Sequence, residues 1–437
     1  MLTGITAVAV AILVLLVLFG LGLPIVVAFL LANLIGVLLL MGPAGFGMFA
    51  NSLFDTATTV ELATIPLFLL VGELLFRGRA IDVLFESVDT LVSRMRGRQY
   101  VLTMLLSVIF AALSGAAMGV AAMLGRSVLP GMQQRGYDPK LSAGAILAGA
   151  SLAPIIPPSV LAIIIGTLAG VSISGLLIAG IIPGLILAGL FFLYIFARVA
   201  MNASLAPVEA DDGGHSATGR DKLLALARMT PFSLIIIFIM GFILLGITTP
   251  SESAATGVIG ALLAAALYRR LTWRMVWDSL RSSMAVASMI LVIMASSKMF
   301  GQFLAFTGGT TALTEMVSQL NWHPAIMFFV LMLFPFIFCM FIDQIALMLI
   351  VIPIYKPLIA TLGFDPIWFW LIFLINITIG GITPPFGYTL FALKGAAPQL
   401  KLGEVFSSAW PFVWIFLFGI FILWLFPALV TYLPSKV

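Results

Sequence analysis

Two pairs of adjacent prolines interrupt apolar runs that are each long enough to cross a lipid bilayer. Pro157–Pro158 stands within the run 140–172, and Pro384–Pro385 stands within the run 366–393. Proline lacks a backbone N–H and clashes with the preceding helical turn, so a regular helix ends at each pair. Carbonyl groups freed inside a bilayer are tolerated only where they are buried in protein or line a polar cavity. The chain therefore has to fold around two interrupted membrane-spanning helices.

Composition places these runs in a membrane. Hydrophobic residues make up 62% of the 437 residues and charged residues only 9%, which is more apolar surface than a soluble core can bury. One cysteine and two histidines leave no disulfide framework and no transition-metal cluster. The net charge of +4 fits basic cytoplasmic loops and does not predict nucleic-acid binding. The apolar N-terminus has no basic n-region or A-x-A cleavage site, so we expect a retained first helix.

Two further apolar runs, 101–134 and 324–358, are too long for one simple span. A helix of that length would extend about 50 Å at about 1.5 Å per residue, well beyond a hydrocarbon core of about 30 Å. Each run has small or polar residues at its middle, "SGAAMG" in the first and "CMFIDQ" in the second. We therefore predict two re-entrant helical hairpins in an all-α polytopic membrane protein.

The predicted organisation is two halves joined by a polar linker. The first half, 1–200, has scaffold helices in 1–77, a cytoplasmic arm helix at 78–98, the hairpin 101–134, the broken helix 140–172 and a closing helix at 175–199. A cytoplasmic linker covers 201–227. The second half, 228–437, has scaffold helices in 229–306, the hairpin 324–358, the broken helix 366–393 and a closing helix at 404–431.

The halves are related by an internal repeat with an offset of 227 residues. "RGYDPK" (135–140) matches "LGFDPI" (362–367), and the two proline pairs align at the same offset. Arginines and a lysine flank the first hairpin, whereas "NWHP" and "TLGFDP" around the second contain neither. The hairpins should therefore enter from opposite sides of the membrane, with both chain termini periplasmic. Inverted repeats with broken helices are typical of secondary transporters.

Several motifs along essentially the whole chain resemble those of one transporter family. They are "GELLFRG", "AMLGRSVLPGMQQRGYDPKLSAGAI", "IPPS", "TPSESAATG", "FIDQIALMLIVIPIYKP" and "TPPFG". They are similar to the large, DctM-like membrane subunit of tripartite ATP-independent periplasmic (TRAP) transporters. The resemblance implies an elevator-type, sodium-driven importer of organic acids in the bacterial inner membrane, with an ion-transporter-superfamily architecture. It also implies two partners, a small four-helix membrane subunit on a separate chain and a periplasmic substrate-binding protein.

The resemblance also implies two sodium sites, where hairpin tips meet broken helices. The first set is Ser114, Gly115, Ala117, Ala153, Ile156 and Ser159; the second is Cys339, Gly380, Thr383 and Phe386. The offset of 227 carries the break residues of the second set onto those of the first. Sodium needs oxygen ligands, which backbone carbonyls supply, so apolar side chains are no obstacle. The substrate is expected between the sites, beside Asp343, Ser114 and both proline pairs.

Charged residues in the apolar runs have two interpretations each. Asp343 either faces the substrate or ion cavity, as intramembrane carboxylates usually do, or caps the second arm of its hairpin; both roles are compatible. Glu73 pairs with Arg77 one turn on, or with Lys298 in the equivalent helix. We favour Arg77, which leaves Lys298 without an obvious partner. Glu252 is expected to cap the helix that follows Pro250.

Two other functions are open to this sequence. A stand-alone divalent-anion/sodium symporter would share the architecture but work without partners; its usual Ser-Asn-Thr tips are not matched by "SGAAMG" or "CMFIDQ". A membrane-embedded enzyme would need a nucleophile with a base, or metal ligands, at membrane depth. The sequence has no Gly-x-Ser-x-Gly motif and no histidine pair, so we assign no catalytic residue and no cofactor beyond the coupling sodium ion.

Overall fold

The computed structural model describes residues 4–436 apart from 79, 93–96, 116 and 208–217, and every element in the described part is helical. The first half contains α1 (Ile5–Gly20), α2 (Ile25–Gly36), η1 (Val37–Met41), α3 (Pro43–Thr58), η2 (Val60–Ala63), α4 (Thr64–Arg77), α5 (Ala80–Leu91), α6 (Arg98–Ser114), α7 (Ala117–Ser127), α8 (Leu129–Gln134), α9 (Pro139–Ala150), α10 (Val160–Ala169), α11 (Ile173–Ala179) and α12 (Ile181–Met201). The linker region contains η3 (Ala203–Leu205). The elements that follow are α13 (Gly219–Leu244), α14 (Pro250–Leu267), α15 (Trp273–Phe306), α16 (Gly309–Gln319), α17 (Pro324–Phe338), α18 (Gln344–Leu362), α19 (Pro366–Gly380), α20 (Tyr388–Ala396), α21 (Leu402–Leu425), α22 (Ala428–Thr431) and η4 (Pro434–Lys436).

The chain is polytopic. Within the described residues, six helices are long and apolar enough to cross a bilayer. A seventh span results if α3 and α4, which meet at an angle of 59°, are counted together. Other apolar helices are too short to cross alone, among them α10, α17 and α19. These short helices belong to the hairpins and interrupted helices.

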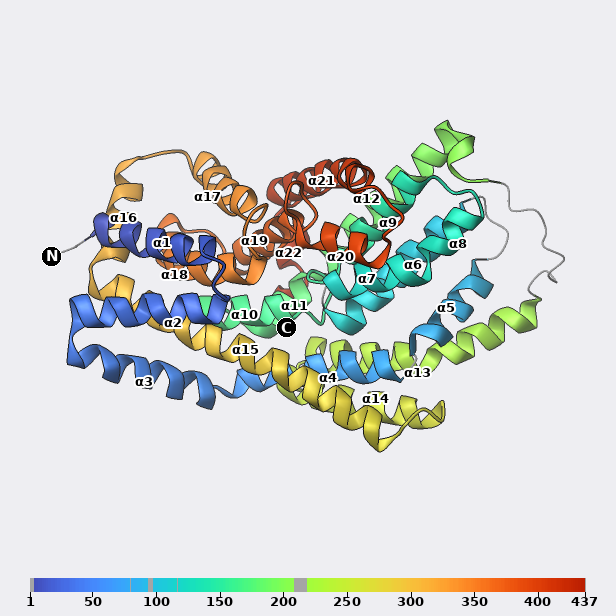
Figure 1. Cartoon of the computed structure of the whole chain (residues 1–437), viewed down its shortest axis with the longest axis horizontal. Helices are drawn as coiled ribbons and strands as arrows, with labels where there is room; N and C mark the ends of the chain where they lie inside the picture. Colours follow the sequence, from blue (N-terminus) through green and yellow to red (C-terminus); the bar gives the residue numbers. More distant parts are fainter. Residues whose placement is uncertain (1–3, 79, 93–96, 116, 208–217, 437) are drawn as a thin grey trace.

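Both hairpins are present as pairs of helices joined at a tight tip. Gly115 ends α6 with a left-handed φ of +60°, a conformation that costs glycine little, and α7 begins at Ala117. The residues from Cys339 to Asp343 form the second tip, and the Asp343 carboxylate caps α18. In Figure 1, α6 and α7 lie on the right of the view and α17 and α18 on the left. The two hairpins therefore approach the centre from different ends of the molecule.

The two proline pairs mark breaks in helices, as predicted. The first break separates α9 from α10 and the second separates α19 from α20, and both proline–proline peptide bonds are cis. Aligned positions at the start of each broken helix have the same local structure. Gly136 and Gly363 have φ of +78° and +68°, and Asp138 and Asp365 cap α9 and α19 by accepting backbone N–H bonds of 2.7 and 2.8 Å. These caps satisfy donors at helix N-termini that would otherwise lack partners.

The core around the breaks joins the two halves. Phe191 on α12 packs edge-on against Phe412 and Phe416 on α21, with ring centroids 5.6 and 5.0 Å apart. The helix after each break packs on the hairpin of the other half, α10 on α18 and α20 on α7. Gly125 on α7 permits this second contact, because a Cβ there would lie 2.8 Å from the Leu393 side chain. Each break is therefore held between elements from both halves.

Short-range predictions about charged residues are confirmed. The Arg77 Nε atom lies 2.8 Å from a Glu73 carboxylate oxygen, and Glu252 forms a capping box with Thr249 at the start of α14. The start of the first helix after the linker differs from the sequence analysis. The helix α13 begins at Gly219, inside the segment 201–227 taken as linker, because a capping box between Thr218 and Asp221 starts it early.

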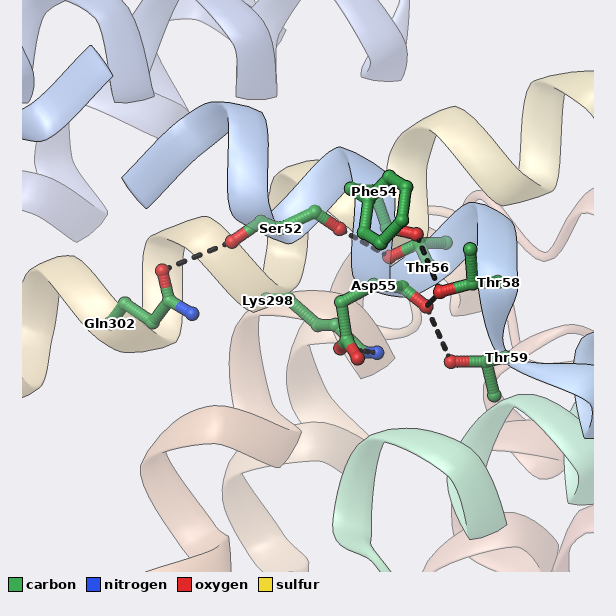
Figure 2. A network of polar contacts seen from close by, with 8 residues as sticks. All are labelled: Ser52, Phe54, Asp55, Thr56, Thr58, Thr59, Lys298 and Gln302. Carbon is green, nitrogen blue, oxygen red and sulfur yellow. Dashed lines mark hydrogen bonds and ion pairs between the residues drawn. The ribbon is translucent and has the colours of Figure 1, made fainter. Parts of the chain in front are cut away.

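Lys298 has a partner that the sequence analysis did not find. Figure 2 shows Lys298 of α15 beside Asp55 of α3, and their charged atoms are 2.6 Å apart. The Lys298 side chain is 21% exposed and that of Asp55 is 68% exposed. One turn away, the Ser52 hydroxyl donates to the Gln302 side-chain oxygen at 3.0 Å. The expectation that Lys298 lacks a partner was wrong, because the two residues are 243 positions apart.

The bend between α3 and α4 starts beside this ion pair. The Thr58 hydroxyl donates to the Phe54 carbonyl at 2.9 Å, and the Thr59 hydroxyl donates to the Asp55 carbonyl at 2.6 Å. Hydroxyl bonds of this kind satisfy carbonyls at the end of a helix and often accompany bends. The ion pair thus joins the last turn of α3 to α15 just before the chain changes direction.

We predict a favourable coupling between Asp55 and Lys298 in a double-mutant cycle. Removing either charge leaves the other unpaired among apolar helices, so D55N and K298Q should each destabilise the protein, and the double variant should lose less than their sum by roughly 0.5–1 kcal/mol. Reversible unfolding in detergent measures the effect. As a control, D55N combined with R274Q should be additive, since position 274 is about 36 Å along α15 from position 298. Additivity of D55N with K298Q would contradict the prediction.

Candidate functional site

The first hairpin tip lies directly against the first break. A Cβ on Gly115 would sit 3.2 Å from the Pro158 carbonyl oxygen and 3.7 Å from the Val160 nitrogen. A Cβ at 3.2 Å would be tight, and the left-handed φ of +60° also favours glycine at this position. Ala117 at the start of α7 and Ala153 in the break are both buried. The structure thus brings Gly115 of the predicted first sodium site against the break on either side of Ser159, and the Ser114 side chain lies outside the described residues.

Carbonyl groups dominate the polar chemistry of the first break. In the described part of the chain, no donor reaches the carbonyls of Ala153, Ile156, Pro157 or Pro158. The prolines explain part of this, since they have no N–H to give to the preceding turn. The Ser159 hydroxyl is already engaged, because it donates to the Pro154 carbonyl and accepts from the Ala162 N–H. The oxygens that remain available for a cation are therefore mostly main-chain oxygens.

The second tip also lies against its break, but here the glycine is on the broken helix and not on the tip. Gly380 at the end of α19 packs on the backbone of Cys339, and a Cβ at Gly380 would overlap that residue. The Cys339 and Phe386 carbonyls accept no hydrogen bond from the described residues. The Gly380 and Thr383 carbonyls each accept one backbone N–H, at 3.2 and 3.1 Å, which leaves a second lone pair on each oxygen. The Thr383 hydroxyl donates to the Ile379 carbonyl at 2.7 Å.

Three polar residues beside the second break were missed by the sequence analysis. They are Gln344, the first residue of α18, and Tyr388 and Thr389, which begin α20. The Gln344 Oε1 atom and the Tyr388 and Thr389 hydroxyls are buried and have no hydrogen-bond partner among the residues that the structure describes. Leaving a buried polar atom unpaired costs free energy, so these atoms favour an additional polar ligand in this region. A polar residue immediately after a helix interruption is the signal that could have identified them.

Asp343 combines a structural role with an accessible position. One of its oxygens accepts the Ile345 and Ala346 N–H groups at 2.9 and 3.4 Å, which confirms the predicted N-cap. The side chain is nevertheless exposed at the molecular surface. Close by, the exposed rings of Phe341 in the tip and Phe386 in the break have centroids 5.9 Å apart. The tip therefore presents a carboxylate beside an aromatic pair.

The two proline pairs differ in accessibility. Pro157 and Pro158 are buried, whereas Pro384 is half-buried and Pro385 is exposed. A solute that reaches this part of the molecule would therefore meet the second pair more readily than the first. The arrangement offers main-chain oxygens at two breaks and an open carboxylate at one tip, and such groups bind ions and polar solutes.

Comparisons with known proteins agree with this architecture. Residues 12–429 match the family model described as "Tripartite ATP-independent periplasmic transporter, DctM component". The C4-dicarboxylate TRAP transporter large permease protein DctM of Pseudomonas aeruginosa is 30% identical, over 91% of this chain and 92% of its own. The 2,3-diketo-L-gulonate TRAP transporter large permease protein YiaN of Escherichia coli is 28% identical, over 95% of this chain and 96% of its own.

A solved structure supports the fold. The YdaH transporter of Alcanivorax borkumensis superposes with a TM-score of 0.61, over 90% of this chain and 88% of that one, at 17% sequence identity. The family match covers the hairpins, both breaks and the helices around them. The chain is a transporter subunit and not an enzyme: it belongs to the DctM family, the large membrane component of tripartite ATP-independent periplasmic transporters.

Proposed function

We propose that this subunit imports an organic acid by sodium-coupled secondary transport, using solute delivered by a periplasmic binding protein. The observation that carries the proposal is that each hairpin tip packs against a helix break. Each of these tip–break junctions also has carbonyls that no donor among the described residues reaches. Relatives are named for C4-dicarboxylate and for 2,3-diketo-L-gulonate, which both carry carboxylates. The substrate class we infer is therefore a small carboxylate, such as a C4-dicarboxylate, a sialic acid or a related acid.

Sodium is proposed to bind at both junctions of tip and break. Gly115, Ala153 and Ile156 lie at the first junction, and Cys339, Gly380 and Thr383 at the second. Hard cations of this kind are held by several oxygens, and main-chain carbonyls suffice. The unpartnered oxygens of Gln344, Tyr388 and Thr389 favour a richer ligand set at the second junction. Asp343 is negative, so it suits the cation better than it suits an anionic solute.

An inverted repeat and an elevator mechanism are part of the proposal. Aligned glycines, aspartate caps and proline pairs share their local structure, and the helix after each break packs on the other half's hairpin. The hairpins, broken helices and closing helices would move as one body against the scaffold of α1–α4 and α13–α15. We place the subunit in the bacterial inner membrane with both termini in the periplasm. The basic residues flanking the first hairpin support this orientation.

Two partners complete the proposed system, a small four-helix membrane subunit and the periplasmic binding protein. The family description, with three parts and no use of ATP, supports this requirement. The alternative of a stand-alone divalent-anion/sodium symporter makes the opposite prediction, namely that the purified chain transports without either partner.

Uptake in proteoliposomes should require an inward sodium gradient and both partners. The substrate is first found by a thermal-shift screen of the cognate binding protein against organic acids, beginning with succinate. Radiolabelled uptake should then fall to background when a sodium ionophore collapses the gradient. Uptake that is insensitive to the ionophore would contradict sodium coupling, and uptake by the chain alone would favour the stand-alone symporter.

D343N should weaken sodium dependence without unfolding the tip. Asparagine caps helices about as well as aspartate, so the substitution removes charge while keeping the cap. We expect the sodium concentration for half-maximal uptake to rise about tenfold, which corresponds to about 1.4 kcal/mol. D365N, which makes the same change at the cap of α19, should leave sodium dependence unchanged. An unaltered sodium dependence in D343N would restrict Asp343 to its capping role.

T389V tests the unpartnered hydroxyl at the second break. Without sodium, removing an unsatisfied buried hydroxyl should be neutral or slightly stabilising. With sodium, the ion-induced rise in Tm should shrink if the hydroxyl is a ligand. T378V is a matched control, because the Thr378 hydroxyl is buried but bonded to the Leu374 carbonyl at 2.7 Å. Equal sodium-induced Tm shifts in T389V and the parent protein would exclude Thr389 from the site.

A further inference from the structure

A groove on the scaffold lies between α13 and α14 and has a volume of about 580 Å³. The two helices are at the lower right of Figure 1. Its lining is apolar apart from Thr256, whose hydroxyl is satisfied by the Ser253 carbonyl. None of its lining residues belongs to the hairpins or the breaks. The groove therefore has no part in the proposed sodium and substrate sites.

Small residues make the floor of the groove and larger side chains make its sides. A Cβ on Gly260 would lie 3.0 Å from the Ile235 side chain, so the two helices are in close contact there. The exposed side chains of Phe238 and Leu263 stand on either side. From Thr256 to Leu267 the groove runs for about 16 Å at 1.5 Å per residue. This length is close to the hydrocarbon depth of one leaflet, about 15 Å.

The length and the lining of the groove fit an acyl chain. An acyl chain needs an apolar channel about one leaflet deep, and the groove provides one over about 16 Å. An acyl chain also needs no hydrogen-bond partner, and the polar residue of the lining, Thr256, is already hydrogen-bonded.

One end of the groove opens at a basic cluster. Leu267 ends the lining of α14, and Arg269 and Arg270 follow directly. Both arginines are exposed, and neither has an ion-pair partner within the described ranges. Across the groove, Arg228 lies one turn before Pro231, and its only acidic neighbour in the described structure is Glu86 at 4.0 Å. The positive charge at this end is largely unbalanced.

Other features place this end at the membrane–water boundary. The Tyr268 hydroxyl donates to the Arg228 carbonyl at 2.5 Å, which ties α13 to α14 beside the cluster. Trp273, at the start of α15, is 79% exposed. Exposed tryptophans and arginines gather at the level of lipid headgroups. The apolar groove is therefore about as long as one leaflet is deep, and it ends at arginine side chains at the level of the lipid headgroups.

We propose that this groove binds an anionic glycerophospholipid, with an acyl chain between α13 and α14 and the phosphate beside Arg269 and Arg270. The apolar lining binds the acyl chain, and the guanidinium groups of the two arginines bind the negative headgroup. Arginine suits this role because its planar donors match phosphate oxygens. The site is independent of the transport chemistry and stabilises the α13–α14 pair of the scaffold.

The headgroup part of the proposal is tested with R269Q/R270Q. The full-length protein is delipidated in mild detergent, and its Tm is followed as phosphatidylglycerol or phosphatidylcholine is added. Phosphatidylglycerol should stabilise the parent protein at concentrations about tenfold lower than phosphatidylcholine, and the double variant should lose this preference. The control K140Q/R198Q removes the same charge from exposed positions on α9 and α12 and should keep the preference. Equal stabilisation of the parent protein by both lipids would overturn the proposal.

The proposed binding of the acyl chain is tested with L263W, because the larger tryptophan side chain fills the groove. The variant should retain less copurified phospholipid in native mass spectrometry and should need about tenfold more phosphatidylglycerol for the same Tm shift. L193W is the matched control, because Leu193 on α12 is 66% exposed, as is Leu263, but lies outside the groove. Unchanged lipid retention in L263W would overturn the proposal. So would a membrane protein partner that copurifies, displaces the lipid and shields L263C from a thiol reagent.

Discussion

Main-chain oxygens that have lost their donors are the constraint on which the rest of this structure depends. A proline pair removes the donors of two residues and stops the preceding helix, and a bilayer supplies no water to replace them. In the structure, a hairpin tip lies against each break. The helix that follows each break packs on the hairpin of the other half. Protein therefore packs against both breaks, closely at the first and only partly at the second, where Pro385 is exposed. The free carbonyls of both breaks are available to a ligand that carries positive charge.

The two junctions reach the same close approach by different means. In the first half the glycine is on the tip, where Gly115 lies against the Pro158 carbonyl. In the second half the glycine is on the broken helix, where Gly380 lies against Cys339. The glycine is thus on the tip in one half and on the broken helix in the other. In both halves it lets the two backbones touch, although the side chains around the two junctions differ. The second junction has the polar side chains, Asp343, Gln344 and Thr389, so the two proposed cation sites would differ in ligand chemistry despite a shared plan.

Features controlled by neighbours in the chain could be predicted from the sequence. The helix breaks follow from proline chemistry, and the caps formed by Asp343 and Glu252 follow from side chains that reach the next turn. The ion pair of Lys298 with Asp55 could not be predicted, because it depends on which helices become neighbours. The same applies to Gln344 and Thr389, because it takes the surrounding helices to show that their side chains have no hydrogen-bond partner within the described ranges. The implied sodium ligands came from resemblance rather than from chemistry visible in the chain.

The charged residues within the apolar regions divide according to what surrounds them. Lys298 and Asp55 neutralise each other across two scaffold helices, which makes their charges a means of fixing α3 to α15. Asp343 has backbone N–H partners but no cation of its own in the described structure, and its side chain is exposed. An intramembrane carboxylate without a positive partner is costly, and such residues mark ion pathways in transporters. The scaffold charges are therefore paired, whereas the carboxylate at the tip has no cationic side chain beside it in the described structure. This difference is expected if the tip binds and releases a cation during the transport cycle and the scaffold does not.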